Sequence, residues 1–284
     1  MKIGFIGAGK VGFSLGKYFK SKGQELSGYF SRTYNSAKDA ADFTESLAFS
    51  YLSDLINESD ILFITVNDDS IHDVWEEISK YDICGKILCH CSGLLTSEIF
   101  DGIHTCKASG ISVHMLYAVS NKYTSFKGLQ NAAFTIEGDE QSRQVMLSIL
   151  SGFGNKVREI EAAHKVKYHA ACCASNLMVA LADMSASMLC ECGFTYDEAQ
   201  EFIMPLLVGS ALNIKNQGIR KALTGPVDRN DVETVNKHLS CLDSNRLSIY
   251  TELSKILVDI AKCNHPENDY TAILKELNDN EKHS

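Results

Sequence analysis

The sequence predicts a two-domain α/β protein, with an N-terminal doubly wound Rossmann domain over residues 1–160 and an all-helical C-terminal domain over residues 161–284. Three observations lead to this prediction. The 284 residues exceed the roughly 250 at which a single core usually stops growing. Short apolar segments alternate with amphipathic ones up to about residue 160, and only helical spacing follows. A glycine-rich turn comes directly after the first apolar segment.

The first domain is expected to alternate strands with helices. Strands are expected at Lys2–Ile6, Leu26–Ser31, Ile61–Val66, Lys86–Cys91, Ile111–His114, Ala133–Ile136 and Val157–Ile160. Helices are expected at Val11–Lys22, Ile71–Tyr81 and Gln141–Ser151. Apolar strands that alternate with helices are typical of a parallel sheet covered on both faces.

The second domain shows helical signals alone. Ala162–Cys192 has one long helical pattern, and Gly193 is expected to end it. Thr195 and Glu198 have the spacing of a capping box for the next helix, in which Pro205 predicts a kink or a late start. Further helices are expected at Asp231–Cys241, Asn245–Lys262 and Tyr270–Leu277, and the polar end Asn278–Ser284 is expected to fray.

Composition excludes several classes of protein. An apolar content of 45% is ample for a core, which excludes a disordered chain. The net charge of −9 is the wrong sign for a protein that binds the nucleic-acid backbone. We find no apolar stretch of the roughly 20 residues that a membrane span needs. The ten cysteines form no regular framework, so we expect free thiols and a cytoplasmic protein.

The segment Gly7-Ala8-Gly9-Lys10-Val11-Gly12 is a G-x-G-x-x-G motif between a strand and a helix, the context of a dinucleotide site. Gly7 permits the tight turn, Gly9 lets a pyrophosphate approach the backbone, and Gly12 lets the helix pack closely on the strand. The N–H groups of the first helical turn then face the phosphates. The alternative is a turn whose glycines serve packing alone.

The end of the second strand indicates which dinucleotide binds. An NAD site usually carries an acidic residue about 20 positions after the glycines, but none lies between Ser27 and Lys38. Ser31, Arg32 and Thr33 instead offer a guanidinium between two hydroxyls, which suits the 2′-phosphate of NADP. The alternative is a solvated arginine at a strand end.

Ligands of such sheets bind beyond the carboxyl ends of the strands. We therefore expect Val66-Asn67-Asp68 beside the cofactor ribose, and Ser92 and Gly93 over the nicotinamide. Ser92 also has the position of an N-cap if Leu94–Phe100 is helical, and the two roles are compatible.

Several motifs resemble known families. The N-terminal part resembles the NADP-binding half of pyrroline-carboxylate reductases and β-hydroxyacid dehydrogenases. Tyr168–Asn176 (YHAACCASN), Leu223–Asp231 (LTGPVDRND) and Cys91-Ser92-Gly93 resemble the family described as Rossmann-like plus domain of unknown function 2520. That resemblance implies an NADP-binding domain joined to an all-helical one. The chain departs from the family at His114-Met115, where the family has His-Pro, and at Arg229-Asn230-Asp231, where it has R-G-D.

A polar stripe is expected on the long helix. Lys165, His169 and Asn176 recur at i, i+4 and i+11, so they share a face. β-Hydroxyacid dehydrogenases resemble this layout but carry a catalytic lysine three or four residues before the asparagine, where this chain has cysteines. We expect His169 to supply the proton, and Ser92 and Asn176 to orient the substrate. Two alternatives stay open: Lys165 as the proton donor, or His169 as a packing residue.

These features predict an NADP-dependent oxidoreductase that transfers a hydride to or from a small carbonyl, imine or alcohol bound between the two domains. The alternative is an inactive dinucleotide-binding sensor or scaffold. The expected partners are a small-molecule substrate and, by resemblance, a second copy bound through the helical domain; neither nucleic acid nor membrane is expected. No metal is expected, because the pairs Cys89/Cys91 and Cys190/Cys192 suit small apolar residues better than a zinc site. A deazaflavin as second cofactor stays open.

Overall fold

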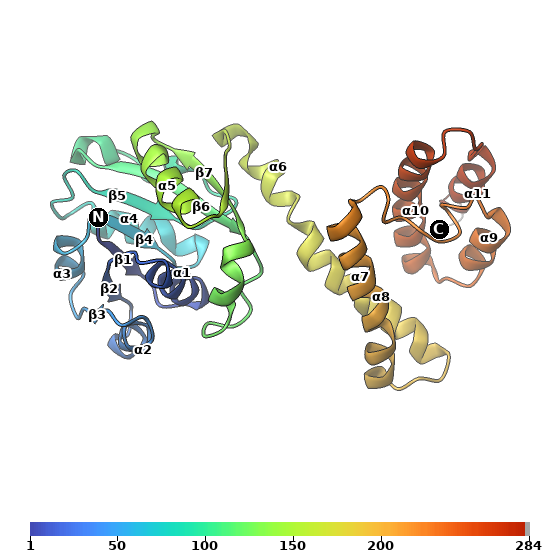
Figure 1. The fold of residues 1–284 in the computed structure, drawn as a ribbon, viewed down its shortest axis with the longest axis horizontal. Coiled ribbons are helices and arrows are strands. Elements are labelled where there is room, and N and C mark those ends of the chain that lie inside the picture. Colours follow the sequence, from blue (N-terminus) through green and yellow to red (C-terminus); the bar gives the residue numbers. More distant parts are fainter. Residues whose placement is uncertain (282–284) are drawn as a thin grey trace. The chain divides into compact units, whose positions relative to one another are not determined.

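The structure, a computed structural model, describes residues 1–281 and contains two compact units, the first spanning Met1–Ser175 and the second beginning at Asn176. A sheet covered by helices fills the first unit, and the second is helical (Figure 1). The predicted fold class is therefore confirmed. The last strand ends at Glu159, close to the expected change of class at residue 160, but the first compact unit continues to Ser175.

The sheet has eight strands in the order β3-β2-β1-β4-β5-β6-β7-β8. Their bounds are β1 Ile3–Ile6, β2 Leu26–Phe30, β3 Leu47–Ala48, β4 Ile61–Ile64, β5 Ile87–His90, β6 Ser109–Leu116, β7 Ala133–Gly138 and β8 Lys156–Glu159. All seven predicted strands are present, and the two-residue β3 is the addition. Strand order reverses between β1 and β4, which makes this the switch point where ligands of such sheets bind.

The expectation of an all-parallel sheet is wrong at two strands, because β7 runs antiparallel to β6 and β8 runs parallel to β7. A parallel neighbour needs a crossover connection, usually an α-helix. Between β6 and β7 the chain forms only the short 3₁₀ segment η4 (Ser125–Asn131) and then turns back. The buried Asn155 amide donates to the carbonyl oxygens of Leu129 and Ala132, at 2.8 and 3.1 Å, and so holds the end of this connection.

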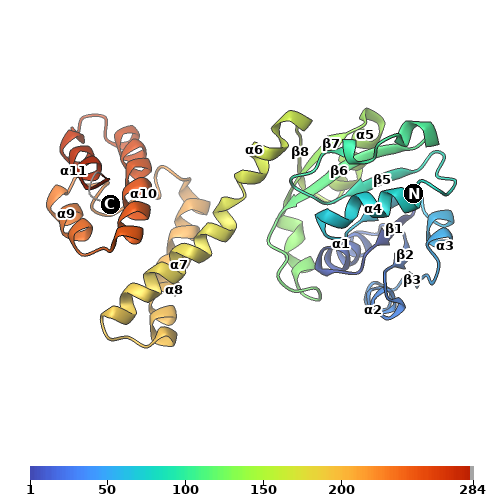
Figure 2. The same cartoon turned by 180° about the vertical axis from the view of Figure 1, so that it is seen from behind.

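Five helices cover the two faces of the sheet (Figures 1 and 2). They are α1 Lys10–Ser21, α2 Tyr34–Thr44, α3 Leu52–Asn57, α4 Ile71–Ile78 and α5 Glu140–Gly152. Side chains of α1, α2 and α5 join one core cluster with Phe5 and Phe63, and those of α3 and α4 join the other with Ile64 and Leu88. Neither α2 nor α3 was predicted from the sequence. α2 buries mainly the small side chains of Ala37, Ala40 and Ala41, and α3 has only six residues.

The long helix expected at Ala162–Cys192 is interrupted. It consists of the 3₁₀ turn η5 (Ala162–His164), α6 (Lys165–Ala170) and α7 (Cys173–Glu191), with a turn at residues 171–172. By length and composition, Ala162–Glu191 qualifies as a candidate membrane span, contrary to our expectation that no segment does. The reason is that Asp183 is the one charged residue between positions 171 and 190.

The second unit contains α8 Tyr196–Gln217, α9 Val232–Ser240, α10 Ser244–Asn264 and α11 Thr271–Glu281 after α7. Gly193, at φ 97°, ends α7, and the capping box of Thr195 and Glu198 starts α8, as predicted. α8 begins well before Pro205 and includes it, so the late start is excluded. Of the end expected to fray, Asn278–Glu281 belongs to α11, and residues 282–284 lie outside the described residues.

Candidate active site

The glycine-rich turn joins β1 to α1. A Cβ atom on Gly12 would lie 2.5 Å from the Gly7 oxygen, and one on Gly7, at φ 104°, would lie 3.0 Å from the Thr65 backbone. The Thr65 hydroxyl donates to the Gly7 oxygen at 2.8 Å and fixes the turn against the end of β4. A Cβ on Gly9 would meet only the Thr65 oxygen, at 3.9 Å. Gly7 and Gly12 therefore serve packing, and Gly9 presents open backbone.

The N-terminus of α1 is free to bind an anion. Its N-cap is Gly9, which has no side chain to accept from the first N–H groups, and the first turn holds no acidic residue. Lys10, in that turn, is exposed. Unpaired N–H groups at the positive end of a helix attract phosphate. The turn thus fits the pyrophosphate of a dinucleotide.

Two hollows meet at this turn. One, of about 350 Å³, is lined by Gly9, Lys10, Val11, Thr65, Val66, Asn67, Asp68, Cys91, Ser92 and Val119. The other, of about 530 Å³, is lined by Ile6, Gly7, Ala8, Gly9, Phe30, Ser31, Arg32, Thr33, Ser36, Thr65, Val66, Asn67, Ser70 and Val74. They share the wall from Thr65 to Asn67. All the predicted cofactor residues except Gly12 and Gly93 line one or the other.

The lining of the second hollow has the positive charge expected of a site for the 2′-phosphate of NADP. Arg32 is the one charged residue of its lining, which contains no carboxylate. Within residues 1–281 the Arg32 guanidinium has no hydrogen-bond or ion-pair partner, and it is exposed. The hydroxyls of Thr33 and Ser36 lie 2.8 Å apart beside it. Ser36, which was not predicted as a site residue, comes from the first turn of α2.

Ser92 lies buried in the turn after β5, and its hydroxyl is fully engaged. It donates to Asp68 at 2.6 Å and accepts from the backbone N–H groups of Leu94 and Leu95, at 3.1 and 3.0 Å. The helix expected at Leu94–Phe100 is instead a turn followed by the 3₁₀ segment η2 (Ser97–Ile99). Ser92 therefore shapes this turn as a cap would. Its predicted contact with a substrate stays a prediction.

Two buried basic side chains, His90 and Lys165, form hydrogen bonds with the backbone of Ser92. His90 Nδ1 lies 3.2 Å from the Ser92 N–H, and its Nε2 lies 3.1 Å from the Thr96 oxygen. Burial, followed by the charge of Lys165, lowers the pKa of His90 to about 4, so the ring is neutral near pH 7. The Lys165 amine is buried and donates to the Ser92 oxygen at 3.0 Å and to the Ser112 hydroxyl at 2.6 Å. Burial lowers the pKa of Lys165.

Two imidazole rings flank Gly93. A Cβ on Gly93 would lie 2.7 Å from Cδ2 of His169 and 2.9 Å from Nε2 of His114. The ring centroids of the two histidines are 6.3 Å apart. Gly93 directly follows Ser92, which lines the smaller hollow. Both rings therefore lie beside the residue that is next in sequence to this lining. His169 was predicted as the proton donor, and its position beside the turn agrees with that role, which stays a prediction.

A hydrogen-bonded chain stands behind His114. The Thr135 hydroxyl donates to the Tyr168 oxygen at 2.9 Å, and the Tyr168 oxygen lies 2.7 Å from Nδ1 of His114. His114 was expected at the end of a strand, where ligands of such sheets bind, and the role of Tyr168 was not predicted. The signal available was that Tyr168 lies three residues after Lys165 and so reaches the same side of α6.

The predicted stripe of Lys165, His169 and Asn176 does not lie on one helix. Lys165 and His169 belong to α6 and the first unit, whereas Asn176 belongs to α7 and the second. Asn176 lines a hollow of about 710 Å³ between α7 and α8, together with Asp183 and Tyr196. Its predicted contact with the substrate stays a prediction.

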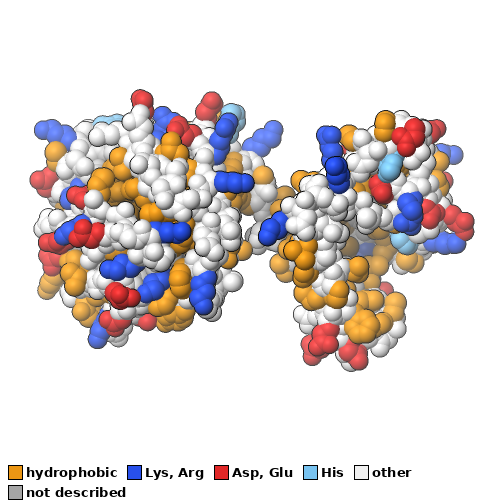
Figure 3. Space-filling model, in the orientation of Figure 1, with side chains coloured by type: hydrophobic (Ala, Val, Ile, Leu, Met, Phe, Trp, Pro, Cys, Tyr) orange, Lys and Arg blue, Asp and Glu red, His pale blue; other side chains and the backbone are white. Residues whose placement is uncertain are grey.

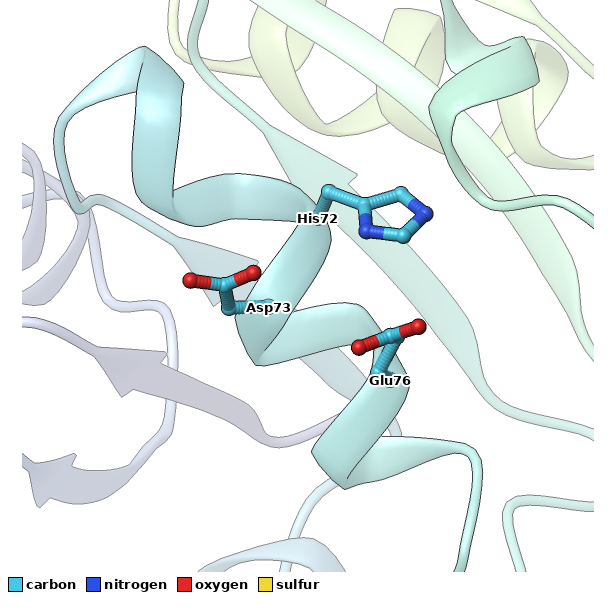
Figure 4. Close-up of side chains that lie close together, drawn as sticks. All are labelled: His72, Asp73 and Glu76. Carbon is cyan, nitrogen blue, oxygen red and sulfur yellow. The ribbon is translucent and has the colours of Figure 1, made fainter.

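The structure contains one possible metal-ligand cluster among its described residues. His72, Asp73 and Glu76, on α4, have donor atoms within 4.8 Å of one another (Figure 4). All three side chains are exposed, and no further ligand within residues 1–281 joins them. All ten cysteines are free, as expected. We assign no metal to this cluster.

Two family models match the chain. Residues 2–92 match the model described as NADP oxidoreductase coenzyme F420-dependent, and residues 132–256 match Domain of unknown function (DUF2520). Each model covers less than half of the chain. Together they confirm the predicted resemblance, and the expected cofactor is the one that the first description names. No curated protein sequence matches the chain.

Solved structures share the fold of this chain. Protein TM1727 from Thermotoga maritima is 26% identical, with a TM-score of 0.74 over 93% of this chain and 99% of that one. Protein BF3122 from Bacteroides fragilis is 20% identical, with a TM-score of 0.67 over 91% and 98%. Imine reductase from Myxococcus stipitatus, in complex with NADP⁺, is 16% identical, with a TM-score of 0.57 over 98% and 99%. Pyrroline-carboxylate reductases share the fold as well.

Proposed function

We propose that the protein is an NADP-dependent oxidoreductase that transfers a hydride to or from a small carbonyl, imine or alcohol. The observation that carries this proposal is the pair of hollows that meet at Gly9. They join an open helix N-terminus, an unpaired arginine and the Ser92 turn along the carboxyl ends of β1, β2, β4 and β5. The matched NADP oxidoreductase model supports it.

In this proposal, different residues of the first unit bind different parts of the cofactor. Gly9 and the N–H groups of α1 bind the pyrophosphate, and Arg32, with the hydroxyls of Ser31 and Thr33, binds the 2′-phosphate. Asn67 lies on the wall shared by both hollows, where the ribose contacts belong. The Ser92 turn borders the nicotinamide end, and bound NADPH supplies the hydride there.

In this proposal His169 supplies the proton that accompanies the hydride. Hydride addition to a carbonyl or an unprotonated imine leaves negative charge on its oxygen or nitrogen, and a positioned imidazolium neutralises it by giving up one proton. The His169 ring lies beside Gly93 and is exposed to water. Lys165 is the weaker candidate, because its buried amine is bonded to Ser92 and Ser112. Asn176 and Ser92 are the proposed orienting groups.

The test follows NADPH absorbance during incubation with a panel of keto acids, imines and aldehydes. His169→Ala should lower kcat by about 10²- to 10⁴-fold on any substrate found, with NADPH affinity nearly unchanged. If Lys165→Ala abolishes turnover and His169→Ala keeps it, the proton role belongs to Lys165. NADPH binding without turnover of any substrate would instead support a dinucleotide-binding sensor or scaffold.

We propose also that two copies associate through the helical unit. Apolar side chains gather on the exposed surface of α7 and α8 (Figure 3). Leu177, Val179, Phe202 and Leu206 are each more than half exposed. A twofold dimer would cover such a surface. Light scattering should give twice 31.3 kDa at micromolar concentration, and a particle of 31.3 kDa would refute the dimer. A cytoplasmic location stays a prediction.

A further inference from the structure

The side chain of His114 is held in a fixed orientation beside Gly93. It projects from β6, and Gly93 leaves room for its Nε2 edge because a glycine has no Cβ. Its other nitrogen, Nδ1, lies 2.7 Å from the Tyr168 hydroxyl. The Tyr168 ring meets the imidazole edge-on, with centroids 5.6 Å apart and planes at 89°. Both ends of the imidazole are therefore fixed in direction.

The hydrogen bonds behind His114 decide which nitrogen carries the proton. The Thr135 hydroxyl donates to the Tyr168 oxygen, so the Tyr168 hydrogen is free to go to Nδ1 of His114. In the reverse arrangement, Nδ1–H would donate to Tyr168 and leave the Tyr168 hydrogen without an acceptor in a half-buried position. The satisfied arrangement makes Nδ1 an acceptor. The neutral ring then carries its proton on Nε2, the edge beside Gly93.

The surroundings of His114 keep the ring neutral. Burial is the largest cause that lowers its pKa to about 4, and the charges of Lys165 and His169 on α6 add to it. Asp68, after β4, acts in the opposite direction and does not offset them. Tyr168 and Thr135 are neutral, and burial raises the pKa of Tyr168. Near pH 7 His114 is therefore a hydrogen-bond donor through Nε2 and not an acid.

We propose that His114 is a substrate-contacting residue whose Nε2–H, aimed past Gly93 by the Tyr168–Thr135 chain, binds the acceptor atom of the substrate, and that the substrate is a carbonyl compound. This rests on the proposed function. A carbonyl oxygen has two lone pairs and accepts from His114 and His169 together. A protonated imine nitrogen has none to offer and would place its own N–H against two donors. Tyr168 and Thr135 are positioning residues.

The first experiment measures the tautomer on the full chain labelled with ¹⁵N-histidine, with NADP⁺ present. The His114 resonances, assigned from their loss in His114→Gln, should show a neutral ring protonated on Nε2 from pH 5.5 to 8. Tyr168→Phe removes the hydrogen donated to Nδ1 and should give a mixture of tautomers. A ring that is charged at pH 7, or protonated on Nδ1, would overturn the inference.

The second experiment measures kcat/KM for NADPH-dependent reduction of cyclohexanone and of 2-methyl-1-pyrroline. The wild type should prefer the ketone. His114→Met removes the donor at similar size and should lower kcat/KM for cyclohexanone about 10- to 150-fold, as expected for a hydrogen bond to developing charge. His114→Gln, whose amide N–H replaces Nε2–H, should recover most of it. NADPH affinity should not change, and the exposed His104→Met is the matched control.

The outcomes separate the two proposals. A preference for the imine, or full activity of His114→Met on the ketone, would overturn the role of His114 and leave the oxidoreductase standing. A wild type that neither binds NADPH nor reduces either probe would overturn the proposed function and this inference with it.

Discussion

Ser92 donates its hydroxyl hydrogen to Asp68 over 2.6 Å, which ties the turn after β5 to the turn after β4. Both residues line the smaller hollow, so one hydrogen bond fixes two walls of the proposed nicotinamide site. The same hydroxyl accepts from the N–H groups of Leu94 and Leu95. Ser92 is therefore a structural centre of the site whether or not it also touches the substrate.

Replacing Ser92 should lower stability more than replacing its partner. Ser92→Ala leaves the two backbone N–H groups of the turn without their acceptor, which typically costs about 1–3 kcal/mol. Asp68→Asn keeps an acceptor oxygen and should change the free energy of unfolding by less than ~1 kcal/mol. The fluorescence of Trp75, the single tryptophan, reports unfolding of the first unit in urea. Equal losses in the two variants would contradict this account.

Gly9→Ala and Gly12→Ala should separate binding from folding. A methyl group on Gly9 meets only one atom, 3.9 Å away, so the chain should fold normally but lose NADPH affinity, because the methyl group occupies the pyrophosphate position. A methyl group on Gly12 would lie 2.5 Å from the Gly7 oxygen and should destabilise the first unit. Urea unfolding followed at Trp75 and NADPH titration measure the two effects. Normal NADPH affinity in Gly9→Ala would show that the turn does not hold the phosphates.

The stability of the first unit should fall as the pH drops from about 6.5 toward 4. The pKa of His90 is 6.5 in the unfolded chain and about 4 in the folded protein. Between these two pH values the unfolded chain binds a proton that the folded protein does not bind, and this proton stabilises the unfolded chain. A shift from 6.5 to about 4 corresponds to about 3 kcal/mol. His90→Gln should flatten the pH dependence by that order, and the exposed His72→Gln should not. An unchanged slope in His90→Gln would refute the buried neutral histidine.

Local patterns predicted most of the first unit. The glycine motif and the apolar strands are read within a few consecutive residues, and the structure confirms them. α2 was not predictable in this way, because alanines between polar residues carry little hydrophobic signal. The direction of β7 depends on the connection before it, which has no helical period to reveal where it returns.

The site was predictable where it follows strand ends and unpredictable where it depends on long-range contacts. Arg32 and Ser92 were predicted as candidates because parallel strands end at one edge of the sheet, and both line the hollows there. The contact of His114 with Tyr168 joins residues 54 positions apart, and that of Lys165 with Ser92 joins residues 73 positions apart. No sequence period encodes such pairs. The break at residues 171–172 likewise separated Asn176 from the predicted helical stripe.

Fluorescence titration of NADPH and NADH into the wild type and Arg32→Ala tests the central claim most directly. The unpaired guanidinium of Arg32 and the absence of a carboxylate in the lining of its hollow predict a preference for NADPH. A charge-assisted hydrogen bond is worth about 1.5–3 kcal/mol, so Arg32→Ala should weaken NADPH binding about 10- to 150-fold and barely change NADH binding. Equal affinities of the wild type for the two cofactors, or an Arg32→Ala variant that binds NADPH as the wild type does, would contradict the account.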